Sequence, residues 1–279
     1  MTAPLEFAGP YAADLVLALE IADAVDALTV AGAQGVVEVE MKPDDTPVTA
    51  IDRAAERLVR ERLGESRPDD AVVGEEYGTT GSGARRWVVD PIDGTKNFVR
   101  RVPVWGTLIA LIDTDADGRE TCAVGVVSAP ALGRRWYAAT GAGAWTVTGI
   151  EGFDREPHAL SVSNVSELSQ ASLSISDLYY WDEVGSSEGL LALQRTVART
   201  RGYGDFWSYM MVAEGQVDIA TEPQLALYDM AALVPIVTEA GGRFTGLDGK
   251  DGPFSGSALA TNGLVHERAL ALLAAPTAS

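Results

Sequence analysis

Cysteine and histidine are almost absent from this chain. Among its 279 residues the only cysteine is Cys122, and the only histidines are His158 and His266. A single cysteine excludes an intrachain disulfide and fits a reducing compartment, so we expect a cytoplasmic protein. The same shortage argues against zinc sites built from cysteine and histidine, and against Cys-His nucleophilic catalysis. We expect both histidines to lie at the surface rather than to bind a metal.

Basic residues and long apolar runs are also scarce. The chain carries 21 Lys and Arg residues against 40 Asp and Glu residues, a net charge of −19. This excess argues against binding to nucleic acid or to an anionic membrane. The uncharged stretch 136–150 is glycine-rich and too short to span a bilayer. Residues 1–10 lack a basic start and a continuous apolar segment, so no signal peptide is expected there.

What the chain does contain is a regular alternation of apolar patterns, in a composition that is 47% hydrophobic. Apolar residues recur at helical spacing in some segments and at strand spacing in others. The helices are expected over residues 15–25, 54–63 (stopped at Gly64), 188–200, 206–214, 229–240 and 266–273. The strands are expected over residues 37–41, 71–73, 87–89, 106–113, 122–129, 135–139, 171–176, 217–221 and 257–261.

Alternating strands and helices predict an α/β fold with helices on both faces of the sheets. A polar, glycine-containing break at residues 149–157 suggests two halves. We expect residues 1–150 to form an N-terminal α+β half and residues 151–279 to form a C-terminal α/β half. Pro235 conflicts with the helix expected over 229–240, because a proline inside a helix removes a hydrogen bond and costs roughly 3 kcal/mol.

The most informative motif is the run Asp-Pro-Ile-Asp-Gly-Thr at residues 90–95, which follows the apolar stretch 87–89. It places Asp90 and Asp93 where a buried strand is expected to end. Carboxylates are the ligands that Mg²⁺ prefers, and the backbone N–H groups of Gly94 and Thr95 can open a helix and bind a phosphate. Asp-Pro and Asp-Gly are also ordinary turn dipeptides, which is the alternative reading.

Two further segments place acidic residues at the ends of expected elements. Gly-Glu-Glu at residues 74–76 closes the apolar run 71–73, and Asp229 opens a helical stretch. An aspartate at the start of a helix is also a common cap. Upstream, Thr49 and Asp52 have the spacing of a capping box before an amphipathic helix.

Together, these motifs resemble the inositol monophosphatase-like family of Mg²⁺-dependent phosphatases, over residues from about 15 to 273. The stretch 42–52, which ends in Asp52, is similar to another motif of that family. The resemblance implies a layered αβαβα sandwich, two or three Mg²⁺ ions in each active site, and a homodimer. Residues 179–187 lie outside the resemblance.

The resemblance also implies roles for individual residues. It implies metal binding by Glu75, Asp90, Asp93, Asp229 and the carbonyl of Ile92. It implies phosphate binding by Asp93, Gly94 and Thr95. It assigns Glu75 and Thr95 to positioning of the attacking water, with Asp52 in the same network, and Asp52 can cap its helix as well.

Within this family the chain is most similar to histidinol-phosphate phosphatases of the actinobacterial type. The similarity lies in residues 96–105, 126–136 and 201–209. It implies hydrolysis of L-histidinol phosphate in histidine biosynthesis. The alternatives are an inositol or other sugar phosphate as substrate, and a silent regulator that binds metal and phosphate without catalysis.

Histidinol phosphate carries an amine and an imidazole, so its pocket should contain negative charge beyond the metal ligands. Asp205 and Glu222 are the candidates, and Asp229 is also assigned to the substrate side. Asp205 can instead cap a loop, and Glu222 can be a solvated residue at a strand end. Arg201 is a further candidate, which can face the phosphate or pair with a carboxylate.

Overall fold

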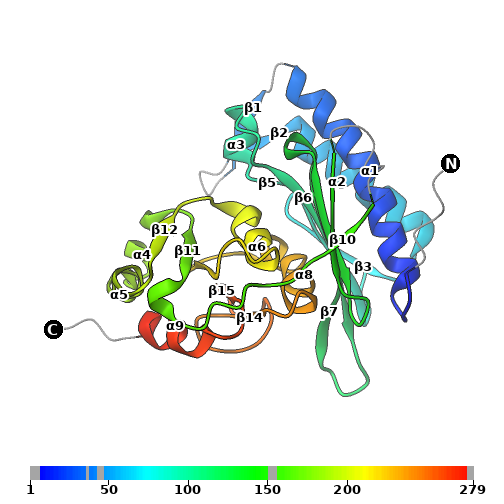
Figure 1. Cartoon of the computed structure of the whole chain (residues 1–279). Helices are drawn as coiled ribbons and strands as arrows, with labels where there is room; N and C mark the ends of the chain where they lie inside the picture. The colour runs from blue at the N-terminus through cyan, green and yellow to red at the C-terminus, as the bar shows by residue number, and fades with distance from the viewer. Residues whose placement is uncertain (1–6, 36–37, 43–46, 150–155, 275–279) are drawn as a thin grey trace.

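The computed structural model describes residues 7–35, 38–42, 47–149 and 156–274. Within these ranges the strands form a sheet of eight, a sheet of five and a small hairpin (Figure 1). The larger sheet has, in spatial order, β10 (His158–Ala159), β9 (Ala144–Thr148), β8 (Arg134–Ala139), β7 (Glu120–Ala129), β6 (Gly106–Thr114), β5 (Arg85–Asp93), β3 (Ala71–Gly74) and β4 (Gly78–Thr80). All neighbours in this sheet are antiparallel except β3 and β5, which run parallel.

The smaller sheet is mixed. Its spatial order is β12 (Arg199–Arg201), β11 (Ser172–Ile175), β13 (Ile219–Glu222), β15 (Ala258–Thr261) and β14 (Arg243–Thr245). Strand β11 pairs in parallel with both β12 and β13, whereas β15 is antiparallel to both of its neighbours. The hairpin consists of β1 (Val39–Met41) and β2 (Pro47–Thr49).

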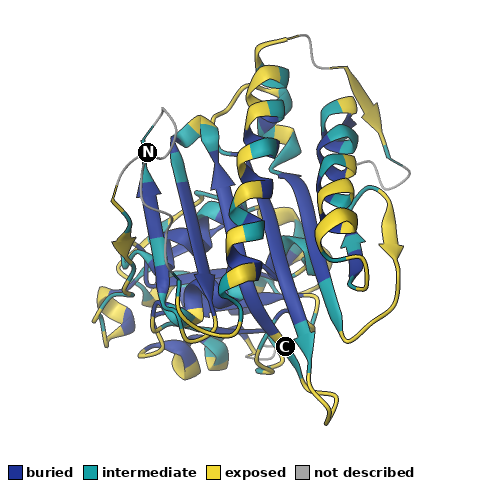
Figure 2. Ribbon diagram, turned by 90° about the vertical axis from the view of Figure 1, so that its right-hand side faces the viewer, coloured by how far each residue is buried: buried dark blue, intermediate teal, exposed yellow. Residues whose placement is uncertain are grey.

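The described helices lie in three layers around the two sheets. They are α1 (Ala12–Gln34), α2 (Ala50–Ser66), α3 (Thr95–Val99), α4 (Leu178–Glu183), α5 (Ser187–Thr196), α6 (Asp205–Ala213), α7 (Leu227–Met230), α8 (Leu233–Glu239) and α9 (His266–Leu273). Helices α1 and α2 cover the outer face of the larger sheet, and Figure 2 shows their exposed outer sides lying across buried strands.

The middle and last layers complete the sandwich. Helices α6 and α8 pack between the two sheets, in a core that includes Trp136 from β8 and Phe244 from β14. Helices α4, α5 and α9 cover the far face of the smaller sheet, where Trp181 is fully buried. The αβαβα sandwich expected from the sequence is therefore confirmed.

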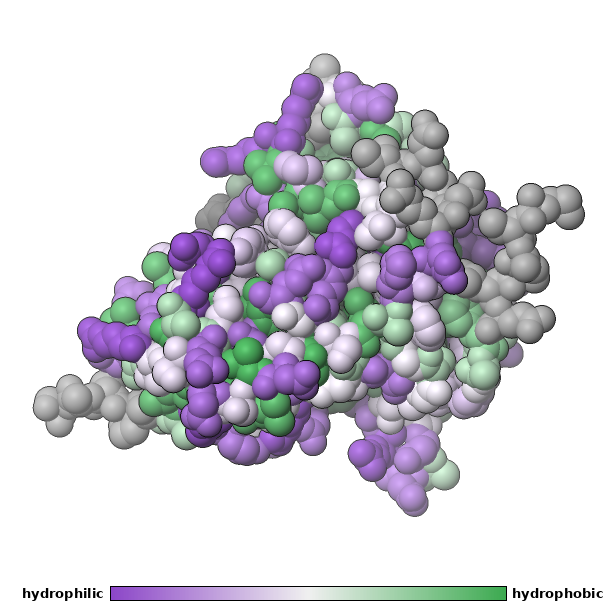
Figure 3. Space-filling model, viewed as in Figure 1, coloured by the Kyte–Doolittle hydropathy of each residue, from purple (hydrophilic) through white to green (hydrophobic). Residues whose placement is uncertain are grey.

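Most of the expected elements are present, and the helix over 266–273 has the expected bounds. Residue 37 of the first expected strand and residues 150–155 of the expected break between halves lie outside the described residues. None of the described helices is long and apolar enough to cross a membrane. On the face seen in Figure 3, hydrophilic and hydrophobic residues are interspersed.

Some expected ends of elements are wrong because the chain continues in the same conformation, as in helix α1, which is expected over 15–25 and runs to Gln34. Helix α2 does not stop at Gly64 but runs to Ser66, before Arg67 and Pro68. The residue before a proline is disfavoured in the helical region, which explains an end at this point. Strand β5 continues beyond the apolar stretch 87–89 and ends at Asp93, with an irregular register between Asp90 and Asp93.

Two expected helices are shorter than predicted. The helix expected over 188–200 ends at Thr196, because residues 199–201 pair with β11 as strand β12. The stretch 229–240 is divided into α7 and α8. Pro235 occupies the third position of α8, where its missing N–H breaks no helical hydrogen bond. The conflict over Pro235 is thus resolved by a new helix start.

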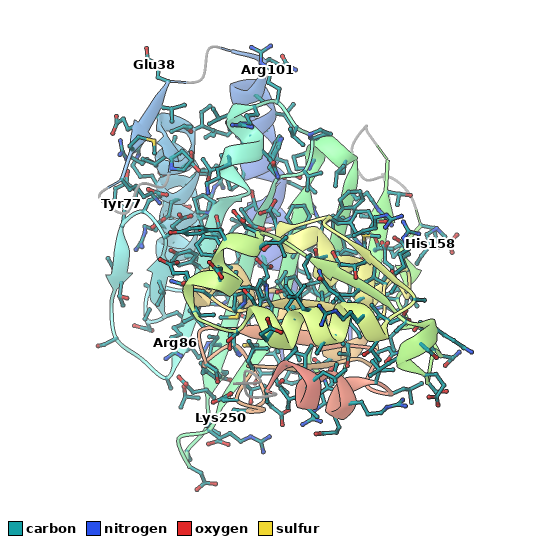
Figure 4. The ribbon with its side chains drawn as sticks, turned by 90° about the vertical axis from the view of Figure 1, so that its left-hand side faces the viewer. Glu38, Tyr77, Arg86, Arg101, His158 and Lys250 are labelled. Carbon is teal, nitrogen blue, oxygen red and sulfur yellow. The ribbon has the colours of Figure 1, made fainter. Side chains whose placement is uncertain are left out.

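The two histidines differ in their surroundings. His158 lies at the periphery of the molecule, as expected (Figure 4). The surface position expected for His266 is wrong, since this side chain is fully buried. Its Nε2 lies 3.1 Å from Oγ1 of Thr245 and its Nδ1 lies 3.0 Å from Oγ1 of Thr261. The two threonines satisfy the ring, so its burial leaves no polar atom unpaired.

Candidate active site

A cleft of about 900 Å³ lies where strands of both sheets end. It is lined from the larger sheet by the end of β5 and the start of α3. The smaller sheet contributes the residues after β11 and the end of β13, and helices α6 and α7 contribute their first turns. Segments that are far apart in the sequence therefore share one cleft. Its lining includes Glu75, Asp90, Ile92, Asp93, Gly94, Thr95, Asp205, Glu222 and Asp229.

Three carboxylates converge on one side of this cleft. One oxygen from each of Asp90, Asp93 and Asp229 lies within 4.8 Å of the others. Asp90 and Asp93 come from the irregular end of β5, where Pro91 has no N–H to donate to the neighbouring strand. A local irregularity of this kind redirects side chains. The third carboxylate, of Asp229, comes from the first turn of α7 and accepts the backbone N–H of Ala226 at 2.7 Å. Asp229 therefore also contributes to a helix start, as the alternative reading expected.

Burial and mutual repulsion disfavour the ionised forms of these carboxylates. Burial raises the pKa of Asp90 well above its usual value, and Glu75 adds to the effect. The pKa of Asp93 is raised in the same way by burial and then by Asp205. For Asp229, burial is again the main cause and the pKa rises to about 7. Clustered carboxylates of this kind, of which Asp90 is buried and the other two are half-buried, are suited to a hard divalent cation, which would offset their charge.

Glu75 reaches the same cleft from the turn after β3. Its Oε1 accepts a hydrogen bond from Nζ of Lys42 at 2.6 Å, and Lys42 also contacts Oε1 of Glu76 at 2.7 Å. Lys42 is the last described residue before the gap at 43–46, which contains part of the motif at residues 42–52. The lysine thus neutralises part of the negative charge on one side of the cleft.

Thr95 and Asp52 meet beside the cleft. Thr95 Oγ1 lies 3.0 Å from the carbonyl oxygen of Ile92 and 3.3 Å from Oδ1 of Asp52. The other oxygen of Asp52 accepts the backbone N–H of Thr49 at 2.9 Å, and Thr49 caps α2 in return. The capping box predicted at Thr49 and Asp52 is therefore present. Burial raises the pKa of Asp52.

Gly94 joins β5 to the short helix α3 in a left-handed conformation, with a φ of 82°. A Cβ atom at this position would lie 2.9 Å from the carbonyl oxygen of Val104, so a side chain would be both strained and crowded. Glycine therefore allows the chain to turn directly from the carboxylates of β5 to Thr95 at the first position of α3.

Asp205 lies on the opposite wall, at the first position of α6 with a φ of 48°. Its Oδ2 accepts a hydrogen bond from Nδ2 of Asn97 at 2.8 Å. Burial raises the pKa of Asp205. A left-handed conformation is uncommon outside glycine, and Asp tolerates it better than most residues. The side chain is thus held in the cleft by both its backbone and Asn97.

Glu222 is buried at the end of β13. It accepts hydrogen bonds from the hydroxyl of Ser176 and, at 3.1 Å, from that of Tyr209. Burial is the main cause of a rise in its pKa to about 8. The solvated position that was the alternative for Glu222 is therefore wrong.

Arg201 is not brought to this cleft. It is exposed at the end of β12, where its guanidinium donates to the carbonyl oxygen of Thr200 at 2.7 Å. It does not line the cleft within the described chain. The role predicted for Arg201 in substrate binding stays a prediction.

Part of the cleft wall was not predicted from the sequence. Asp177, Leu178 and Tyr180 line it from the start of α4, and Tyr203 lines it from the loop before α6. Tyr180 belongs to the segment outside the family resemblance. The only local signal is Asp177, which caps α4 by accepting the backbone N–H of Tyr179 at 2.9 Å. Trp181 of α4 is buried in the core against the smaller sheet and anchors this helix beside the cleft.

Comparisons with known proteins agree with this arrangement. The model of the inositol monophosphatase family matches residues 11–278. The chain is 55% identical over 264 residues to a histidinol-phosphatase of Streptomyces coelicolor, covering 94% of this chain and 97% of that protein. It is 56% identical over 264 residues to a histidinol-phosphatase of Mycobacterium tuberculosis, covering 93% and 97%. A solved inositol monophosphatase from Zymomonas mobilis is similar with a TM-score of 0.81 at 28% identity, over 95% of this chain and 99% of that one.

Proposed function

Because this chain belongs to the inositol monophosphatase family, we propose that its cleft hydrolyses L-histidinol phosphate to L-histidinol and inorganic phosphate. The chain is a metal-dependent phosphoric monoester hydrolase. Its identity to two histidinol-phosphatases over nearly the whole of both chains supports the choice of substrate. We also propose that Mg²⁺ is the cofactor, with two or three ions per site, and that the enzyme is a cytoplasmic homodimer that acts in histidine biosynthesis.

The residues of the cleft fit a divalent cation. Asp90, Asp93 and Asp229 offer hard oxygen ligands close together, and Glu75 and the carbonyl of Ile92 are the other proposed ligands. When bound, Mg²⁺ would lower the pKa of water and offset the charge that develops on the phosphate during displacement. The carboxylates of Asp90, Asp93 and Asp229 would hold the cation next to the start of α3.

The phosphate end of the substrate would lie against the start of α3. Gly94 and Thr95 would offer backbone N–H groups to its oxygens, as the family resemblance implies, next to Asp93. Thr95 and Glu75 would orient the attacking water. Asp52 supports this role, since its Oδ1 lies 3.3 Å from the Thr95 hydroxyl and can accept its proton.

The single observation that carries the substrate assignment is a second set of carboxyl groups in the cleft, which a bound cation would hold in their ionised form. Beyond the proposed metal ligands, the cleft is lined by the carboxyl groups of Asp177, Asp205 and Glu222. Among the described lining residues, Lys96 is the only cationic side chain. An amine and an imidazole suit such a wall, and the rings of Tyr180 and Tyr203 offer faces to a flat cation. A neutral polyol gains less from buried negative charge.

The test is phosphate release with Mg²⁺ from four substrates: histidinol phosphate, inositol 1-phosphate, fructose 1,6-bisphosphate and adenosine 3′,5′-bisphosphate. We expect kcat/KM to be highest for histidinol phosphate. A higher value for inositol 1-phosphate would favour the sugar-phosphate alternative. No release from any of the four would favour a silent binding protein.

A further inference from the structure

Glu56 is a fully buried carboxylate that lies outside the lining of the cleft. It projects from the second turn of α2 into the turn between β3 and β4. Its Oε2 accepts the backbone N–H of Glu76 at 2.6 Å, and its Oε1 accepts that of Tyr77 at 3.2 Å. Arg60, one turn further along α2, pairs with the same carboxylate at 2.7 Å. Both oxygens of Glu56 are therefore engaged by the turn or by Arg60.

The turn is shaped to receive this carboxylate. A Cβ atom on Gly74 would lie 2.0 Å from Oε1 of Glu56, so only glycine leaves room for it. Tyr77, at the other end of the turn, lies at the periphery of the molecule (Figure 4). Between these two residues, Glu75 donates its backbone N–H to the carbonyl oxygen of Val89 at 3.3 Å and lines the cleft. Glu56 therefore holds the segment that carries Glu75 through hydrogen bonds to the two residues that follow Glu75.

Helix α2 also contacts Thr95, the second residue proposed to orient the attacking water. Asp52 lies one helical turn before Glu56, on the same side of α2, and its carboxylate meets the Thr95 hydroxyl. One rigid helix therefore contacts both Thr95 and the turn of Glu75. A buried carboxylate whose hydrogen bonds are satisfied can hold its partners in a single arrangement.

We propose that Glu56 is a positioning residue, which fixes Glu75 in the geometry that binds the divalent cation. This inference rests on the proposed function, in which Glu75 is a metal ligand. Residues that orient metal ligands through hydrogen bonds typically contribute about 10- to 100-fold to metal affinity. A carboxylate that merely closes a surface turn would instead affect folding stability and leave metal affinity unchanged.

The test measures the affinity for Mn²⁺, as a paramagnetic substitute for Mg²⁺, from the signal of free Mn²⁺ in electron paramagnetic resonance. We expect Glu56→Gln to weaken Mn²⁺ binding about tenfold, because the amide presents an N–H₂ group to one of the turn's N–H groups. We expect similar weakening in Glu56→Asp, which keeps the charge but is one methylene shorter. The Mg²⁺ concentration for half-maximal activity should rise in parallel.

The matched control is Glu214→Gln. Glu214 is another buried carboxylate, which pairs with Arg134 and accepts from Nε1 of Trp136 at 2.6 Å, and it does not line the cleft. This control should lose stability without any change in Mn²⁺ affinity. Wild-type affinity in both Glu56 variants would overturn the inference. So would weakening in Glu56→Gln alone, since that would be an effect of charge rather than of position.

The same experiment distinguishes a failure of the proposed function from a failure of the role proposed for Glu56. If the wild-type protein binds no Mn²⁺ and turns over in the presence of a chelator, the metal-dependent part of the proposed function fails and Glu56 has no metal ligand to position. If the wild type behaves as proposed, the Glu56 variants alone decide. Should Glu56→Gln lack a cooperative thermal transition, Glu56→Asp decides the question, and its wild-type Mn²⁺ affinity would overturn the inference.

Discussion

Oδ2 of Asp93 accepts the backbone N–H of Phe206 at 2.8 Å. This bond joins the end of β5, in the larger sheet, to the first turn of α6, in the layer between the sheets. Next to it, Asn97 donates to Asp205. The segment that carries the proposed metal ligand Asp93 is therefore tied by two hydrogen bonds to the segment that carries the proposed recognition residue Asp205. A change at either residue should be tested for effects at the other.

Replacing Asp93 by asparagine should abolish turnover but preserve the fold. The amide oxygen can still accept from Phe206, whereas a neutral side chain cannot hold a divalent cation as a carboxylate does. A metal ion supplies several kcal/mol of transition-state stabilisation, so we expect a loss on the order of a thousandfold or more. The measurement is phosphate release at saturating Mg²⁺, with circular dichroism to check folding. Substantial activity in the folded variant would remove Asp93 from the metal site.

Removal of divalent cations should abolish the activity of the enzyme, and adding them back should restore it. Oxygens of Asp90, Asp93 and Asp229 lie within 4.8 Å of one another, an arrangement suited to a divalent cation, so we expect catalysis to depend on an added cation. Activity should vanish in EDTA and return when Mg²⁺ is added in excess. Turnover that persists in a fully chelated sample would show that the proposed metal-dependent mechanism is wrong.

Asp205→Ala and Glu222→Gln should impair recognition of the cationic end of histidinol phosphate. The loss of a buried, charge-assisted hydrogen bond costs about 1.5–3 kcal/mol, which is roughly one to two powers of ten in kcat/KM. The same variants should be much less impaired on p-nitrophenyl phosphate, which has no cationic end. The exposed Glu38, outside the cleft lining, provides the control variant Glu38→Gln. Equal losses on both substrates would mean that the two residues support the metal site or the fold.

Tyr180 and Tyr179 offer a matched pair in α4. Tyr180 lines the cleft, while Tyr179 is 64% exposed and does not. Tyr180→Ala should raise KM for histidinol phosphate by roughly fivefold, the equivalent of about 1 kcal/mol from a ring facing a cation. Tyr179→Ala should leave KM unchanged. If both variants behave alike, Tyr180 has no specific contact with the substrate.

His266 should make stability depend on pH in the acid range. Burial lowers its pKa from 6.5 to about 4. In the unfolded chain the ring binds a proton below about pH 6.5, whereas the folded protein resists protonation until about pH 4. The contribution of His266 to the free energy of unfolding is therefore fully present above pH 6.5. It is lost as the pH falls towards 4, by up to about 3 kcal/mol.

The measurement is urea unfolding of the wild type and of His266→Gln at pH 8 and pH 5. We expect the wild type to lose about 2 kcal/mol more than the variant between the two pH values, since glutamine does not titrate. An equal loss in both proteins would show that other groups cause the dependence on pH.

The sequence by itself determined the parts of the molecule that depend on local patterns. The alternation of apolar residues identified the strands at 106–113 and 122–129 and the helix at 266–273, because side-chain periodicity reports which faces are buried. The run at residues 90–95 placed Asp90 and Asp93 close together, since they are three residues apart in one chain segment. The capping box at Thr49 and Asp52 was likewise readable from spacing alone.

Only the tertiary structure decided which distant segments meet. The parallel pairing of β11 with β13 places Ser176 against Glu222. Glu222 is therefore buried, although a solvated position at a strand end was the alternative for it. The packing of α9 against β14 and β15 encloses His266. In the other sheet, the packing of α2 against the turn after β3 brings Glu56 to the segment that carries Glu75. Periodicity shows that a face is covered but not by what, because the covering residues are distant in sequence and are selected by shape and by hydrogen bonds formed only in the folded chain.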